Sequence, residues 1–280
     1  MTKVKKFVPN WFNESTPPGT YRSLFKWGDP AGFKHPNSGL VRLIMERFHL
    51  VESDLQTPQQ LGLEMVQEEI PVNLAQQHSD AIKAIVGDEN VAFDTYARIR
   101  CSYGGSMMDA LRLRRRIIEN LPDLVLTPRT AAEIQQVIDY CDQHLVPVYV
   151  HGAGSTVTRG MEAVKGGVTL DMSRHMKRVL SFNEVDQTIT VEPGMTGPEL
   201  EDLLNHAPER LGARRRYTCG HFPQSFEYSS VGGWVVTRGA GQNSTYYGKI
   251  EDIVVAQQYA TPRGPFKTCP HPRSANGPDF

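Results

Sequence analysis

Two glycine-rich stretches carry the residues of this chain that could do chemistry. The longer one, Gly220–Asp252, interleaves six glycines with small hydroxyl side chains and aromatic residues. The shorter one, His151–Thr156, is HGAGST and directly follows an apolar segment. Glycine lets backbone N–H groups approach a ligand that side chains would otherwise hold away, and such groups bind phosphate. The two stretches therefore predict two surfaces that could grip one extended dinucleotide.

The elements around the shorter stretch predict a βαβ unit that begins near Asp123. The apolar segment Leu124–Leu126 is followed by a capping box at Thr130–Glu133 and then by apolar residues at helical spacing. A second apolar segment, Val146–Val150, predicts the returning strand. The glycines come directly after that strand, where backbone amides at its carboxyl end can meet a pyrophosphate. The pattern is not the nicotinamide-dinucleotide fingerprint, because GxGxxG with a later acidic residue is absent.

The rest of the chain predicts further strands and helices. Strands are expected over Gly167–Ser173, Arg178–Phe182, Gln187–Gly194 and Ile250–Thr261, and helices over Gly39–Phe48, Ser106–Asn120, Thr196–Leu204 and Ser229–Thr237. The Gly232–Gly233 pair allows close packing of the last of these helices. Residues 1–117 contain helices and proline-rich and glycine-rich loops without a phosphate loop, which predicts an N-terminal helical extension packed on the core.

Composition excludes several classes of protein. The chain has 280 residues, 39% of them hydrophobic, and a formal charge of −1, so no global field favours nucleic acid. Its four cysteines show neither a CxxC nor a zinc spacing, so we predict no metal and a reducing compartment. No segment resembles a signal peptide or a membrane span, and a soluble, cytoplasmic protein is expected.

Two local basic runs remain open to two interpretations. One contains Arg112 and Arg114–Arg116, and the other is Arg214–Arg216. Runs of this kind usually form a solvated face. The alternative is a site for lipid phosphate or headgroups, which would bring peripheral membrane contact.

Several motifs together resemble the FAD-binding (PCMH-type) domain of the vanillyl-alcohol oxidase flavoprotein family. They are VHGAGSTVTRG at Val150–Gly160, VEPGMTGPEL at Val191–Leu200 and the block Gly220–Asp252 with GHFPQSFEYS and VGGW. Within that family the likeness is to the bacterial alkyldihydroxyacetonephosphate synthase-like (alkylglycerone-phosphate synthase-like) proteins. It reaches Lys26–Asn37, Thr261–Gly264 and Gly277–Phe280. The resemblance implies an α+β fold, with a two-subdomain PCMH-type domain over 118–280. Because the family continues beyond this point into a cap domain, C-terminal truncation is expected.

The resemblance also implies the cofactor and the residues that hold it. FAD would contact three segments: Val150, His151, Gly152, Ala153, Gly154, Ser155 and Thr156; Gln224, Ser225, Phe226, Glu227, Tyr228, Ser229 and Ser230; and Thr237, Arg238, Gly239 and Ala240. Many relatives attach FAD covalently through a histidine in the glycine run. Here the aligned position is Gly154, so we predict a non-covalent flavin and a structural role for His151. His221 is either a core imidazole or a neighbour of the isoalloxazine.

Arg273 is the predicted catalytic residue, because it matches an arginine of the synthases near the active site. A guanidinium there suits a phosphate or carboxylate; an ordinary surface arginine is the alternative. The implied reaction replaces the acyl group of acyl-dihydroxyacetone phosphate by a fatty alcohol through a flavin N5 adduct, which yields an ether-lipid precursor. An FAD-dependent oxidase or dehydrogenase of a 2-hydroxy acid or alcohol is the rival, and an inactive flavin-binding fragment is a third. The expected partner is a small-molecule or lipid-phosphate substrate, and a homodimer stays open.

Overall fold

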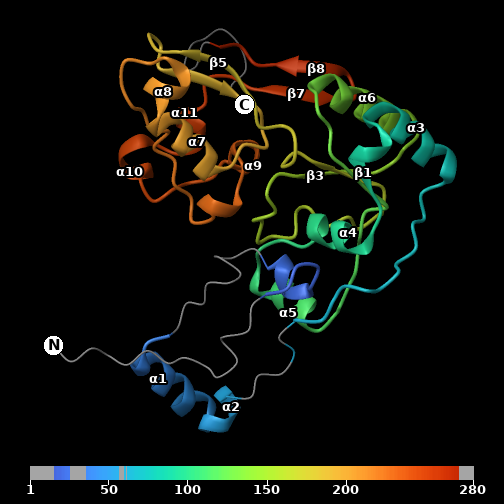
Figure 1. Ribbon diagram of the computed structural model, residues 1–280, viewed down its shortest axis with the longest axis vertical. Helices are drawn as coiled ribbons and strands as arrows, with labels where there is room; N and C mark the ends of the chain where they lie inside the picture. The colour runs from blue at the N-terminus through green and yellow to red at the C-terminus, as the bar shows by residue number, and fades with distance from the viewer. Residues whose placement is uncertain (1–15, 26–35, 57–59, 61, 271–280) are drawn as a thin grey trace.

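The computed structural model describes residues 16–25, 36–56, 60 and 62–270. The predicted catalytic residue Arg273 lies outside the described residues, as do Gly277–Phe280 and most of Lys26–Asn37. Mixed helices and sheets make up the described part, as the sequence predicts (Figure 1).

A four-stranded sheet positions the shorter glycine stretch. Its strands are β1 (Val91–Ala92), β2 (Leu124–Leu126), β4 (Val168–Asp171) and β3 (Val148–His151), in that spatial order. β2, β4 and β3 are parallel, and β1 pairs antiparallel with β2. The predicted βαβ unit is confirmed as β2, α6 (Ala131–Gln143) and β3, with β4 inserted between its two strands. The carboxyl ends of the three parallel strands therefore lie along one edge.

Two helices cover this sheet and form its core. α3 (Gln76–Val86) packs against α6, and both bury apolar side chains against the strands. Cys141 is buried in this core, which raises the pKa of its thiol to about 11. Thr130 caps α6 by accepting from Glu133 N, but Glu133 accepts from Arg129 N instead of completing a capping box. α3 and β1 belong to residues 1–117 and share the core of the following domain.

The remaining N-terminal elements are mostly helical. They are η2 (Tyr21–Leu24), α1 (Ser38–Phe48), α2 (Glu52–Gln56), η3 (Asp88–Asn90), α4 (Thr95–Ser102) and α5 (Met107–Arg114). η2, α4 and α5 share a second core. α1 begins within one residue of the predicted helix, capped by Asn37, and buries none of its residues.

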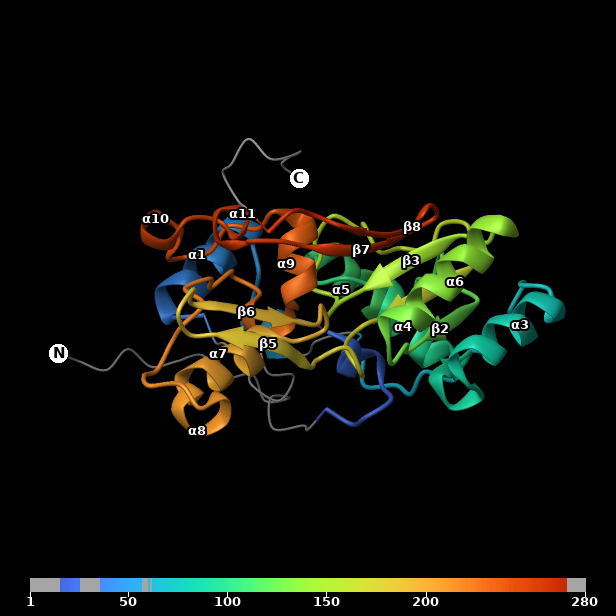
Figure 2. The same ribbon diagram turned by 90° about the horizontal axis from the view of Figure 1, so that it is seen from above.

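A second subdomain contains the longer glycine-rich stretch. Its elements are β5 (Val179–Asn183), β6 (Thr188–Val191), α7 (Gly197–Asn205), α8 (Ala207–Leu211), η4 (Phe226–Tyr228), α9 (Val231–Thr237), α10 (Ser244–Tyr247) and α11 (Ile250–Ile253). A third core joins α7, α9 and α11 to β5 and β6. Figure 2 shows this group beside the four-stranded sheet, with the hairpin of β7 (Gln258–Thr261) and β8 (Gly264–Lys267) reaching α6.

The predicted strand over Ile250–Thr261 is wrong in its first half. Residues 250–253 form α11, and only Gln258–Thr261 is a strand. Asp252 accepts from Lys249 N, which caps a helical turn, while Ile250 is buried against α9. Local capping and packing outweigh the alternating pattern here.

Candidate cofactor site

The two predicted cofactor segments meet at Gly152 and Ser230. A Cβ placed on Gly152 would lie far inside van der Waals contact with Ser230 Oγ. Gly152 follows β3 directly, and Ser230 caps α9 by accepting from Gly233 N at 3.3 Å. Stretches about eighty residues apart in sequence therefore form one surface at the carboxyl edge of the sheet, as the sequence predicts.

The shorter stretch has the backbone geometry that needs glycine. Gly154 has φ +78°, in the left-handed region where a Cβ is unfavourable. His151 and Gly154 are buried, while Gly152, Ala153, Ser155 and Thr156 are half-buried. Val150 points away from the core and is 58% exposed. The loop is therefore short of bulky side chains and is only partly buried.

Neighbouring loops hold Ser230 in place. Val231 N donates to Met195 O at 2.8 Å, and Gly232 N donates to Pro193 O at 2.9 Å. A Cβ on Gly232 would collide with Pro193, so the predicted close packing of the glycine pair is against the turn after β6. The N-terminal turn of α9 is therefore fixed by backbone contacts.

Trp234 organises the segment Gln224–Ser230. Its indole Nε1 donates to Ser229 Oγ at 2.6 Å, and Ser229 Oγ donates to Ser225 O at 2.8 Å. The Trp234 ring also stacks near Phe226. Gln224 and Glu227 are exposed, Ser225, Phe226 and Tyr228 are half-buried, and Ser229 and Ser230 are buried.

The third predicted segment, Thr237–Ala240, lies at the other end of α9. A seven-residue helix is about 10 Å long, so this segment does not share the Gly152–Ser230 contact. Thr237 Oγ1 donates to Gly233 O, and Arg238 forms an ion pair with Glu251. A ligand that touches both ends of α9 must be extended.

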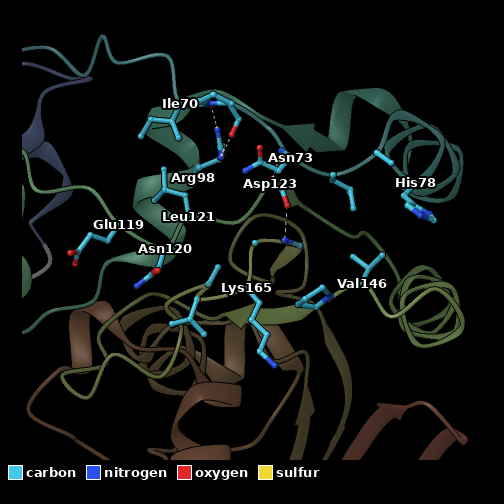
Figure 3. A pocket seen from close by; sticks show the side chains of 18 of the residues that line it. Ile70, Asn73, His78, Arg98, Glu119, Asn120, Leu121, Asp123, Val146 and Lys165 are labelled. Carbon is cyan, nitrogen blue, oxygen red and sulfur yellow. Dashed lines mark hydrogen bonds between the residues drawn. The ribbon is translucent and has the colours of Figure 1, made fainter.

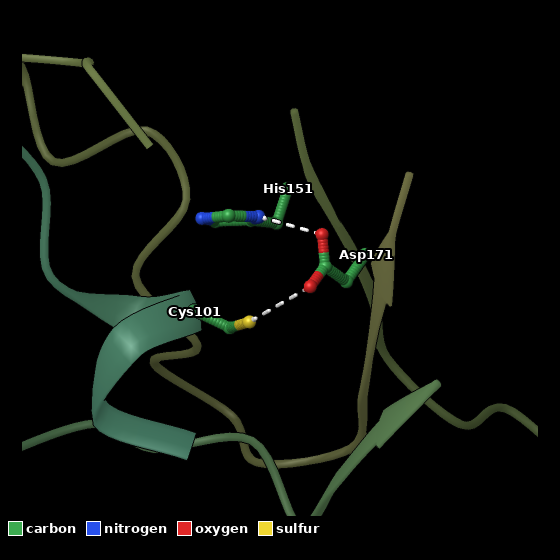
Figure 4. Close-up of side chains that lie close together, drawn as sticks. All are labelled: Cys101, His151 and Asp171. Atoms are coloured by element: carbon green, nitrogen blue, oxygen red, sulfur yellow. Dashed lines mark hydrogen bonds and ion pairs between the residues drawn. The ribbon is translucent and has the colours of Figure 1, made fainter. Parts of the chain in front are cut away.

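His151 takes part in a buried charge network, as predicted for a structural residue. Its Nδ1 lies 3.0 Å from Asp171 Oδ1, and Figure 4 shows the ring directed at that carboxylate. Arg100 forms an ion pair with the other oxygen of Asp171, and Ser173 donates to Oδ1 through its amide and hydroxyl. Burial alone would raise the pKa of Asp171, but the hydrogen bond and charge of His151, with Arg100 and Ser173, hold it well below its usual range.

His221 is a core imidazole. It is 1% exposed, packs edge-on against Trp234 and has no hydrogen-bond partner among the described residues for either ring nitrogen. Burial lowers its pKa, so the ring is neutral at pH 7. A Cβ on Gly239 would touch His221 Nε2 at 3.8 Å, which places the ring next to the third predicted segment.

The sequence analysis missed a contributor from the N-terminal region. Gly105 N donates to Thr156 O at 2.8 Å, and a Cβ on Gly104 would collide with that same oxygen. The pair Gly104–Gly105 was a visible signal, but it lies outside any strand–glycine–helix pattern. The role of Asp171 was also missed. The available signal was an aspartate that directly ends a buried apolar strand, β4.

A separate cavity of about 560 Å³ opens at the opposite end of the sheet. Residues just before each parallel strand line it, including Asp123, Pro147 and Gly167 (Figure 3). Arg98 donates from this wall to the carbonyls of Pro122, Ile70 and Pro71. The Asp123 carboxylate in the same wall accepts from Gly167 N and Asn73 N. The cavity is remote from the predicted cofactor segments, which follow the carboxyl end of β3.

The first basic run is not a uniform solvated face. Arg112 is buried and bonds Asp109, Glu119 and Glu162 while lying over the Tyr103 ring. Arg116 pairs with Glu64 at the surface.

In the described part of the chain, no helix is both long and apolar enough to cross a bilayer.

Comparison with known proteins identifies the family. The model of the FAD binding domain matches residues 122–270, which is more than half of the chain. The chain belongs to the FAD binding domain family. FAD is therefore the cofactor of this domain. The residues present fit it, because the left-handed Gly154 lets the loop turn directly after β3 and Gly152 lets that loop approach the start of α9.

Relatives of this FAD binding domain include several flavoenzymes. Alkyldihydroxyacetonephosphate synthase of Caenorhabditis elegans is 32% identical over 200 residues, which cover 69% of this chain and 32% of that protein. Mitochondrial D-lactate dehydrogenase (cytochrome) of Arabidopsis thaliana is 33% identical over 146 residues, which cover 52% of this chain and 24% of that protein. This chain spans about a third of the length of the synthases it matches.

A solved structure of alkyldihydroxyacetonephosphate synthase shares the fold. Its TM-score is 0.66 at 30% identity, over 71% of this chain and 39% of that one. The PCMH-type FAD-binding fold and the FAD cofactor are thus confirmed. The contacts of the individual predicted residues, the domain boundary at 117/118 and the role of Arg273 stay predictions.

Proposed function

We propose that this FAD binding domain holds FAD non-covalently and serves an alkylglycerone-phosphate synthase-like enzyme. The observation that carries the proposal is the contact of Gly152 with Ser230, which joins both glycine-rich stretches into one cradle. The bound isoalloxazine supplies the chemistry, and the protein supplies position and electrostatics.

The chain's own residues have defined tasks in this proposal. Backbone amides of Gly152–Thr156 would hold the pyrophosphate, in a loop that turns at the left-handed Gly154. Ser230 and its neighbours form the opposite wall, fixed by Met195 and Pro193. The pyrophosphate would therefore be held mostly by neutral backbone donors, because Arg100 is paired with Asp171.

The synthase reaction is supported by how far the likeness extends. The match to the nematode synthase covers 200 residues, more than the family model spans, so it includes sequence outside the shared FAD domain. The match to the lactate dehydrogenase covers 146 residues, about the length of that domain alone. The proposed substrates are an acyl-dihydroxyacetone phosphate and a fatty alcohol, and the products are the alkyl ether and the free fatty acid.

An FAD-dependent oxidoreductase of a 2-hydroxy acid is the second candidate. It is favoured by the lactate dehydrogenase likeness, since the same domain serves both chemistries. The two reactions differ in electron balance, because the exchange of acyl for alkyl needs no external acceptor and alcohol oxidation does.

The test is a binding measurement followed by two assays. We expect the purified chain to take up FAD and show flavin absorbance between about 350 and 500 nm. Alkyl ether formation from acyl-dihydroxyacetone phosphate and hexadecanol, without reduction of a dye acceptor, supports the synthase. Dye reduction with D-lactate or glycolate and no ether product supports the oxidoreductase. No flavin uptake contradicts both.

The flavin should be dissociable. Gly154 occupies the position of the attaching histidine in covalent relatives, and glycine offers no side chain for a bond. We expect acid precipitation of the loaded protein to leave all yellow colour in the supernatant. Flavin fluorescence on the denatured chain in a gel would contradict the prediction.

A further inference from the structure

One segment of the N-terminal region holds both ends of the predicted pyrophosphate loop, Gly152–Thr156. At its start, His151 bonds Asp171, and Asp171 is paired with Arg100 at the end of α4. At its finish, Thr156 O accepts from Gly105 N. Arg100 and Gly105 are five residues apart in the segment Arg100–Gly105, which precedes the residues matched by the family model.

The buried carboxylate of Asp171 is the hub of this arrangement. It receives hydrogen bonds from β3, from α4 and from Ser173 of the following turn, and its side chain is fully buried. His151 and Asp171 are also register partners on adjacent parallel strands. Asp171 therefore ties the last residue of β3, where the loop begins, to a helix from another part of the chain.

The same side chains do not make a metal centre. Ligand atoms of Cys101, His151 and Asp171 lie within 4.8 Å of one another (Figure 4). However, the Arg100 guanidinium already neutralises Asp171, and a cation placed there would be repelled at short range. The groups form a charge-paired structural hub.

We infer that Arg100–Gly105, acting through Asp171 and His151, is a clamp that preorganises the pyrophosphate loop for FAD. This inference rests on the proposed FAD cradle. A run of glycines has few side chains to hold its own shape and loses much conformational freedom on ordering. Contacts that fix both ends lower that loss before the cofactor arrives, so they raise its affinity. Asp171 and Arg100 are positioning residues in this scheme.

The experiment compares Asp171→Asn with Asp123→Asn in the full chain. Asp123 is the matched control, because like Asp171 it is a buried aspartate. It accepts from two backbone amides, Gly167 N and Asn73 N, at the other end of the sheet. FAD affinity is measured by titration of flavin fluorescence, and apo stability by circular dichroism on heating. We expect both variants to lose stability, but only Asp171→Asn to bind FAD at least tenfold more weakly.

A second pair of variants separates positioning from folding. Arg100→Gln should weaken FAD binding in the same direction, and the double variant Arg100→Gln/Asp171→Asn should be no weaker than Asp171→Asn alone, since both changes break one contact. Bound metal is measured on the same samples by elemental analysis, and none is expected.

Distinct outcomes overturn distinct parts. A wild-type chain that binds no FAD overturns the cradle and the clamp together. Wild-type binding with unchanged affinity in Asp171→Asn overturns the clamp alone. Equal losses of affinity in Asp171→Asn and Asp123→Asn also overturn it, because the effect is then one of general stability. Stoichiometric zinc that is lost in Asp171→Asn assigns the hub to a metal.

Discussion

The two ends of the parallel sheet use the same residue types for opposite purposes. At the amino end, Asp123 accepts from backbone amides, and a Cβ on Gly167 would collide with Pro147 O. At the carboxyl end, Asp171 accepts from the side chains of His151, Arg100 and Ser173 as well as from Ser173 N, and Gly152 faces Ser230 of the other subdomain. Each end combines a buried aspartate with glycines, but only the carboxyl end carries the predicted cofactor segments.

The difference lies in what the glycines approach. At the amino end, Gly167 N donates to Asp123 and Val168 N donates to Pro147 O, so the backbone groups are consumed within the fold. At the carboxyl end, the loop after β3 is held at its two ends, and all its residues except the buried Gly154 are half-buried. A cavity marks the amino end, but its lining residues Asp123 and Arg98 are hydrogen-bonded to the backbone of the fold, so a hollow by itself does not locate the chemistry.

The largest effects should come from the paired substitutions Gly152→Ala and Gly167→Ala. Gly152→Ala pushes Ser230 away from the loop, so we expect FAD binding to weaken more than tenfold with little change in apo stability. Gly167 has φ +81° as well as the collision with Pro147, so its alanine variant should lose at least about 2 kcal/mol of unfolding free energy. FAD titration and urea unfolding measure the two effects.

Gly160→Ala is the matched control for both. Its Cβ would meet only Thr158 Oγ1 at 3.9 Å, and its backbone does not require glycine. It should leave affinity and stability unchanged. The contrast between the two ends fails if Gly152→Ala mainly unfolds the protein or if Gly167→Ala selectively weakens FAD.

Local signals predicted much of the fold and of the cradle. The apolar segment Leu124–Leu126 is β2, residue for residue, and all three of its residues are buried between neighbouring elements. The helix predicted over Thr196–Leu204 is α7, and Thr196 N donates to Glu199 Oε2 at its start. The predicted meeting of the two glycine stretches is observed, because a strand end and a helix start are the places where backbone donors are left over.

The clamp could not be predicted from such signals. Arg100 and Asp171 are separated by seventy residues, and nothing in local spacing links them. Arg112 belongs to a run of arginines that resembles a solvated face, but Glu162 draws it into the interior. Ion pairs between residues far apart in the sequence depend on the tertiary structure, so the local sequence around each residue does not predict them.

A charge network near the amino-end cavity should act on stability alone. Burial by itself raises the pKa of Glu162, but hydrogen bonds from Arg159, Arg112 and Asn120 outweigh it and lower the pKa to about 2. A depressed pKa means that the contribution is present above the ordinary value of 4.5 and is lost as pH falls towards 2. The loss should be on the order of 3 kcal/mol for the ionised group.

Urea unfolding of wild type and Glu162→Gln between pH 2 and pH 7 measures this term. We expect Glu162→Gln to be less stable at pH 7 and the difference to shrink as the pH approaches 2. FAD affinity at pH 7 should stay within twofold of wild type, in contrast to Asp171→Asn. A stability difference that is independent of pH would show that Glu162 acts through packing.

The smallest effect is expected for Ser229→Ala on the wall opposite the glycine loop. The change removes the acceptor of Trp234 Nε1 and the donor to Ser225 O, so it should cost about 1 kcal/mol of unfolding free energy. Because Gly152 faces Ser230 and not Ser229, FAD affinity should fall only about threefold, through looser positioning of the wall. Ser181→Ala on β5, an exposed serine, is the control. A drop in affinity as large as that of Gly152→Ala would mean that the wall, rather than the loop after β3, provides most of the binding energy. The difference in FAD binding between the two ends of the sheet would then be due to the second subdomain and not to the sheet itself.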